Sequence, residues 1–206
     1  MAISYPLDFP TNKGLTRVVF GALTSSATVS SPYTFQMQVQ ESLGELWTVD
    51  ISLPLMSRED AELWITFLLK LRGKKGTFLF GDPYGREPRG HALGSPVVNG
   101  GSQVGETLEV AGFPANAGNL LLAGDYIQIE NSLYKVLDDV SSDSLGFASI
   151  EIFPRIKISP PDSATIIMNN AKGLFRLTQN KGQYYEITNP IDSGLYSLGF
   201  SAIEAL

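Results

Sequence analysis

The chain of 206 residues contains no cysteine and a single histidine, His91. The lack of cysteine excludes disulfides, thiolate nucleophiles and cysteine-ligated zinc or iron–sulfur sites. One histidine excludes a metal site with two histidine ligands, and a serine triad would have to be built on that single imidazole. We therefore expect no catalytic residue, no cofactor and no metal site, and we expect that the protein is not an enzyme.

Charged residues and long apolar segments are also scarce. Charged residues make up 17% of the chain and the formal net charge is -6, while 43% of the residues are hydrophobic, which excludes a disordered protein. The acidic balance argues against nucleic-acid binding, because that affinity comes mainly from lysine and arginine. No apolar run approaches the roughly 18 residues of a membrane span. The first ten residues also lack the basic region of a signal peptide.

Turn-forming residues are abundant, with 20 glycines and 12 prolines placed between short apolar runs. This spacing is typical of many strands joined by turns. Residues 34–40 and 47–53 alternate apolar and polar side chains on either side of Gly44, which predicts a half-buried antiparallel hairpin with Phe35 and Trp47 facing inward. Further strands are predicted over 77–80, 107–110, 125–130, 133–137, 148–153, 165–168, 175–177, 184–188 and 195–203.

One long helix is predicted over Arg58–Arg72. Ser57 lies at the position of an N-cap, and Asp60 at the acidic position of a capping box. Acidic residues gather at the start and basic residues at the end, which suits the helix dipole. Gly73 then provides a left-handed end.

The apolar face of this helix is wider than a single packing partner needs. Its candidate interface or core residues are Trp64, Phe67, Leu68 and Leu71. Two interpretations are open at this point: the helix is wholly internal, or part of its surface is shared with a neighbouring subunit.

Other candidate sites have ordinary structural explanations. The segment 73–77 (GKKGT) follows a helix and lacks the spacing of a phosphate-binding loop, so we expect a turn with solvated lysines. His91 lies in a loop rich in turn formers. The acidic cluster of Asp138, Asp139 and Asp143 does not match an EF-hand, which leaves a solvated turn as the expectation and a weak calcium site as the alternative.

Two adjacent tyrosines are candidate partner-facing residues. Tyr184 and Tyr185 fall in a predicted strand, so their side chains point to opposite faces and at least one is expected to meet solvent or a partner. This pair leaves a glycan-binding β-module open as an alternative function.

The order of elements, more than any single motif, resembles a known family. A hairpin is followed by LPLMSREDAELWITFLLKLRGKKGTFLFGDP (residues 53–83), LLAGDYIQIENSLYKVLDD (121–139), PRIKISPPD (154–162) and GLFRL (173–177). This order is similar to that of tail-tip proteins of long-tailed bacteriophages (siphophages), and the most similar functional type is the distal tail protein.

The resemblance implies a mainly β fold with one principal α-helix. Residues 1–83 and 155–206 would form a belt domain, a β-sandwich or split barrel with one packed helix, and residues 84–154 an inserted small β-barrel. Glycine and proline clusters at 81–90 and at Pro160-Pro161 agree with breaks near these places.

The resemblance also implies a function without catalysis. Distal tail proteins form hexameric rings that connect the tail tube to the tail-tip hub and fibres, and DNA passes through the lumen without specific binding. The implied partners are other copies of this chain, the tail tube protein and hub or fibre proteins, with no membrane involved. The implied location is the tail tip of the virion, assembled in the host cytoplasm. Another minor tail or tail-completion protein is the remaining structural alternative.

Overall fold

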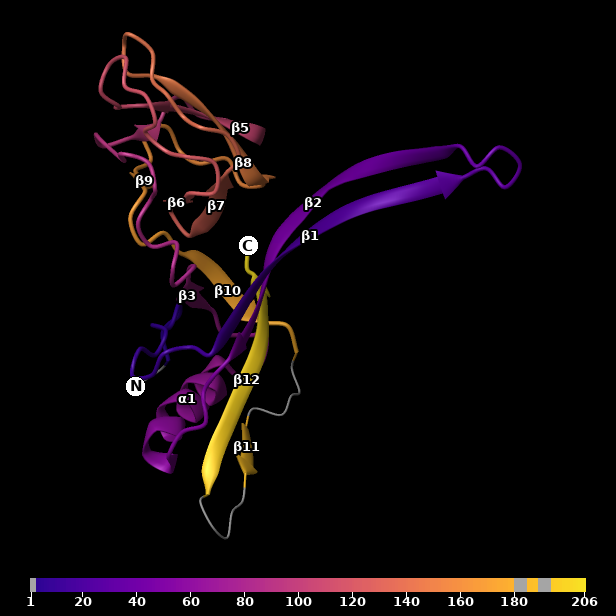
Figure 1. Cartoon of the computed structure of the whole chain (residues 1–206), viewed down its shortest axis with the longest axis vertical. Helices are drawn as coiled ribbons and strands as arrows, with labels where there is room; N and C mark the ends of the chain where they lie inside the picture. The colour runs from indigo at the N-terminus through magenta and orange to yellow at the C-terminus, as the bar shows by residue number, and fades with distance from the viewer. Residues whose placement is uncertain (1–2, 180–184, 189–193) are drawn as a thin grey trace.

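The computed structural model describes residues 3–179, 185–188 and 194–206. Within these residues the chain forms one α-helix and two antiparallel sheets (Figure 1). The first sheet and its packed helix are sandwich-like, and the second sheet is a nearly closed small barrel. The predicted fold class, mainly β with one principal helix and a small barrel, is confirmed.

The first sheet has the strand order β1-β2-β12-β10-β3. Strand β11 pairs with the N-terminal part of β12, residues 195–198. The bounds of these strands are β1 Arg17–Ser30, β2 Met37–Ser52, β3 Phe78–Phe80, β10 Gly173–Leu177, β11 Tyr185–Thr188 and β12 Leu195–Glu204. The chain near Leu7 covers the outer edge of β3, since Leu7 N donates to Thr77 O at 2.8 Å. At the opposite edge of the sheet lies β1.

Helix α1 (Arg58–Leu71) ends one residue before the predicted end. Arg72 takes the left-handed conformation with φ of 51°, so the helix stops before Gly73 is reached. The predicted capping box is wrong in detail: the Ser57 side chain accepts no bond from a helical amide, and its hydroxyl instead donates to Asp60 Oδ2 at 3.1 Å.

The first core lies between α1 and the first sheet and is rich in aromatic side chains. Trp64, Phe78 and Phe175 are among the largest fully buried side chains. Phe9, from the N-terminal segment, contacts the rings of Trp64, Phe67, Phe78 and Phe80. Edge and tilted ring contacts of this kind stabilise a core beyond simple burial of apolar area.

The second sheet has the strand order β4-β5-β8-β7-β6-β9. A bridge between Val97 and Thr165 brings its two edges together, and Val98 N donates to Ala164 O at 2.9 Å, so the barrel is nearly closed. Its own core is aliphatic, built largely from isoleucine, leucine and valine. The strand bounds are β4 Val97–Val98, β5 Gly105–Ala111, β6 Tyr126–Ile129, β7 Ser132–Val136, β8 Ala148–Ile156 and β9 Ile166–Ile167.

The second sheet extends further along the chain than residues 84–154. Strand β9, at Ile166–Ile167, pairs with β6 in this sheet, and the first sheet resumes only at β10. The chain leaves the first sheet close to where it returns, because Gly81 packs against the carbonyl of Ala171. A Cβ at Gly81 would lie 2.0 Å from that oxygen, which explains a glycine there.

The predicted hairpin around Gly44 is wrong. Residues 37–52 form one continuous strand, β2, whose partner is β1, and the turn between them lies at residues 31–36. Phe35 was expected to face inward and is 85% exposed, whereas Trp47 is buried as expected. Strand β1 was not predicted.

No helix in the described part of the chain has the length and apolarity needed to cross a membrane.

Candidate assembly surfaces

The structure places all four predicted helix residues inside the first core. Trp64, Leu68 and Leu71 are 0% exposed, and Phe67 is nearly buried. The chain itself therefore covers this face, which favours the internal interpretation for these four side chains. The apolar residues that α1 leaves in solvent are instead Leu63 and Leu69.

The two predicted partner-facing tyrosines cannot be placed in the same way. Tyr184 lies outside the described residues. Tyr185 is the first residue of β11, where its backbone pairs with Leu198, and its side chain lies outside what the structure describes. Both remain predictions.

The most conspicuous surface feature is the far half of the β1–β2 hairpin. We call residues 22–44 the arm. It extends away from both the first sheet and the barrel (Figure 1), and all its residues except Ser31 are exposed. An isolated two-stranded ribbon is at best marginally stable in water. The arm therefore has the properties of a segment that is completed by a partner.

The arm combines apolar side chains with a scarcity of charge, since Glu41 is its one charged residue. No charged residue occurs between Arg17 and Glu41. On one face of the ribbon, Met37 and Val39 lie opposite Ser30 and Thr28. Its large exposed apolar residues are Leu23, Val29, Tyr33, Phe35, Met37, Val39 and Leu43. An edge strand of this length without lysine or proline invites pairing or packing with another chain.

The tip of the arm is a defined turn. The Ser31 hydroxyl accepts hydrogen bonds from the backbone N–H groups of Tyr33 and Thr34, both at 3.3 Å. Phe35 adopts φ of 53°, and its N–H donates to Ser31 O at 2.9 Å. This turn holds Tyr33, 91% exposed, and Phe35 outward. The tip thus presents two aromatic side chains on an ordered backbone.

The root of the arm is fixed to the barrel by one arginine. Arg155, in β8, places Nη2 2.8 Å from Glu106, 3.2 Å from Glu41 and 3.3 Å from Glu45. Its backbone N–H also donates to Glu45 Oε2 at 2.7 Å. The carboxylate oxygens lie within 4.8 Å of one another, but the guanidinium already lies among them. The cluster therefore acts as a clamp between the arm and the barrel, in which Arg155 and Glu45 are largely buried and Glu41 and Glu106 are exposed.

A second set of contacts beside this clamp joins the first sheet to the barrel. The buried Glu204 carboxylate in β12 accepts hydrogen bonds from Lys157 Nζ at 2.7 Å and from the backbone N–H of Trp47 at 3.1 Å. The Trp47 indole N–H donates to Leu133 O, in β7, at 3.0 Å. Because the buried Glu204 carboxylate is paired with Lys157, the contact orients the barrel on the sheet without an unpaired buried charge.

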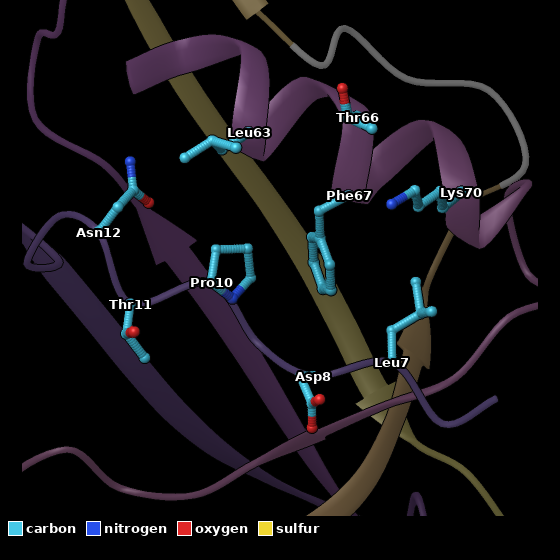
Figure 2. Close-up of a pocket in the computed structure, with 9 residues that line it drawn as sticks. All are labelled: Leu7, Asp8, Pro10, Thr11, Asn12, Leu63, Thr66, Phe67 and Lys70. Carbon is cyan, nitrogen blue, oxygen red and sulfur yellow. The ribbon is translucent and has the colours of Figure 1, made fainter. Parts of the chain in front are cut away.

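An apolar groove lies beside α1, at the side where the N-terminal segment passes it. It has a volume of about 570 Å³ and its floor and walls include Leu7, Pro10, Leu63 and Phe67. In Figure 2, Leu63 and Phe67 point from the helix towards this N-terminal segment, and the amine of Lys70 lies at one end. We call this the α1 groove. The remaining lining residues are Asp8, Thr11, Asn12, Thr66 and Lys70.

One ion pair holds the N-terminal wall of the groove to the helix. Lys13 Nζ lies 3.1 Å from Asp60 Oδ2, and this hydrogen bond, helped by Ser57, lowers the pKa of Asp60 from its ordinary value of 3.8. A lowered pKa in the folded state means that the stabilisation is present above pH 3.8 and is lost as the pH falls through the folded-state value.

We expect Lys13→Met to raise the pKa of Asp60 towards 3.8, because the largest cause of the lowering is removed. Carboxyl chemical shifts followed by NMR during a pH titration measure this change. Lys75→Met, which removes the same charge from the turn after α1, is the matched control. An equal rise of the pKa in both variants would contradict a specific role for Lys13.

The other candidate residues behave as turn or loop residues. The carboxylate of Asp143 accepts the N–H groups of Leu145 and Phe147, and that of Asp139 accepts the N–H of Ala123. These bonds are typical of acidic residues that shape a turn. The backbone N–H of the exposed His91 donates to Asn119 O.

The arm is the part that sequence reasoning missed. The alternating residues around Met37 and Val39 predict a half-buried face, and the small and hydroxyl residues of β1 show no alternation at all. The available signal was the uncharged stretch between Arg17 and Glu41, which is too polar for a core and too poor in charge for an ordinary surface.

No protein family and no curated protein matches the chain.

Proposed function

We propose that this chain is a virion structural protein of a long-tailed bacteriophage, a distal tail protein whose copies form a hexameric ring between the tail tube and the hub and fibres of the tail tip. The observation that carries the proposal is the arm, which has a single charged residue, leaves both cores and keeps its apolar side chains in solvent. A monomer gains nothing from such a ribbon, whereas a subunit of an assembly buries it.

The rest of the fold supports the same role. A sandwich-like sheet with one helix supplies a rigid body, and the barrel is oriented on it by the contacts of Arg155 and Glu204. The order of these elements is the one that resembles distal tail proteins. A barrel held in this manner would display its outer loops at a constant angle around a ring, which suits the attachment of hub or fibre proteins.

The proposed mechanism is mechanical and electrostatic, with no catalytic step. Each copy offers the same surfaces, so contacts between unlike surfaces propagate from copy to copy and close into a ring when the rotation between neighbours allows it. A subunit with net charge -6 would let DNA pass the lumen, because carboxylates repel phosphates and do not release their counterions. The tail tip of the virion, assembled in the host cytoplasm, is the proposed location.

Purified protein is expected to form rings, alone or when the tail tube protein is added. Light scattering coupled to size-exclusion chromatography measures the mass of the assembly, and negative-stain images show its symmetry. A protein that stays monomeric even with tube and hub proteins present would contradict the proposal. Rings of another symmetry would contradict only the hexamer.

A further inference from the structure

We propose that the arm tip of one copy binds in the α1 groove of a second copy, with Tyr33 and Phe35 as the inserted side chains. This inference deepens the proposed function and rests on it, since it names the contact that would join one subunit to the next. The arm tip exposes two aromatic side chains, and the α1 groove has an apolar part that is open to solvent.

The arm reaches beyond its own chain. Thr24 pairs with Glu45 at the clamp, and seven residues later Ser31 begins the tip. At a rise of about 3.4 Å per residue, these seven residues place the tip roughly 24 Å beyond the clamp. The arm also leads away from α1 (Figure 1), so its tip does not meet the groove of the same chain. An arm tip that binds in a groove must therefore come from another molecule.

The tip and the groove are chemically complementary. The groove offers Leu63, 57% exposed, together with Phe67 and Pro10 as an apolar lining. A volume of about 570 Å³ is within the range of roughly 300–1,000 Å³ in which proteins hold small organic groups, so aromatic side chains can enter. Asp8 and Lys70 lie among the lining residues, where they can bond to the phenol hydroxyl of an inserted Tyr33.

Order and charge at the tip favour a second copy as the partner. The bonds of Ser31 already fix the turn, so little conformational freedom is lost when it binds. The arm carries no charge between Arg17 and Glu41, so it can approach an acidic copy of the same chain without repulsion. A basic or acidic partner would instead select charged residues on the arm.

The geometry of this contact agrees with a closed assembly. The tip and the groove are different surfaces, so each subunit can bind one neighbour through its tip and be bound by another through its groove, which is a heterologous contact. Such contacts close into a ring when a whole number of the rotations between neighbours adds up to a full turn. The clamp at Arg155 keeps the direction of the arm constant from copy to copy.

Cysteine cross-linking tests the contact, because the chain has no native cysteine. Thr34→Cys places a thiol at the tip, and Thr66→Cys places one in the α1 groove. A protein with both changes is assembled, with tail tube protein where rings require it, and mildly oxidised. The expected product is a ladder of covalent oligomers that ends at the ring size. Single variants mixed together should give dimers only.

The matched control combines Thr34→Cys with Leu145→Cys, which is an exposed position on the barrel. It should give no ladder. As a second measurement that needs no cysteine, Tyr33→Ala and Phe35→Ala should each weaken self-association by about tenfold or more, the effect of a buried anchor residue. Both residues are exposed in the single chain, so neither change should affect folding.

The outcomes separate this inference from the proposed function. Rings without a ladder above the control, and unaffected by Tyr33→Ala and Phe35→Ala, would overturn the tip-in-groove contact and leave the ring proposal intact; the arm would then bind the tube or hub protein. Monomers in every mixture, with the unaltered protein included, would overturn both. A ladder that depends on Thr66→Cys supports the contact.

Discussion

Replacing Trp64 with aspartate should prevent the first core from forming. The Trp64 side chain is 0% exposed, and its ring contacts Phe9 at 5.2 Å and Phe67 at 6.4 Å between ring centroids. Removing it leaves a large cavity, which alone costs about 3–5 kcal/mol. The new carboxylate would lie within the hydrophobic core, which adds a desolvation cost.

The cavity and the buried carboxylate of Trp64→Asp together cost an amount comparable with the whole free energy of unfolding of a domain, about 5–15 kcal/mol. Circular dichroism and urea unfolding measure the loss. Leu69→Asp introduces the same carboxylate on the same helix at a residue that is 59% exposed, and it should leave the fold intact. If Trp64→Asp were as stable as this control, the assignment of the helix faces would be wrong.

Removing the arm should abolish assembly but leave the fold of the remaining chain intact. Strands β1 and β2 pair Thr24 directly with Glu45, so residues 25–44 can be replaced by an Asn-Gly dipeptide in a two-residue hairpin turn. The deleted residues lie outside both cores, and only Glu41 among them contacts the clamp at Arg155. We therefore expect the free energy of unfolding to change by about 1 kcal/mol or less.

Light scattering should show a monomer under the conditions in which we expect the full chain to form a ring, because the apolar arm surface is the part that a neighbour would bury. Tyr84→Ser is the matched control, since Tyr84 is also an exposed aromatic residue but lies outside the arm. It should leave the ring unchanged. A truncated chain that still forms rings would remove the main support for an assembly role of the arm.

Prediction succeeded where the signal was local. The bounds of α1 follow from acidic residues at its start, basic residues at its end and apolar residues at helical spacing, all within one segment. The barrel strands were found because glycine, asparagine and aspartate mark the turns between them; β6 and β7, for example, meet at Asn131.

Prediction failed where the partner of a segment lies far away in the chain. Alternation around Met37 indicates that the strand has two different faces. It does not indicate whether the apolar face packs on a core or stays exposed to solvent. Arg155 and Glu45 are 110 residues apart, and no local pattern connects them. The α1 groove likewise forms only because the N-terminal segment passes the helix.

The amino-acid sequence alone is enough to specify a β-rich chain with one helix, and it supplies neither thiol nor paired histidines for catalysis. These properties depend on local backbone preference and on composition. Which apolar surfaces the chain covers by itself is a property of the tertiary structure: Trp64 and Leu68 are enclosed, whereas Leu63 and the arm are left open. Burial requires segments distant in sequence to meet, and that meeting is decided by the whole fold.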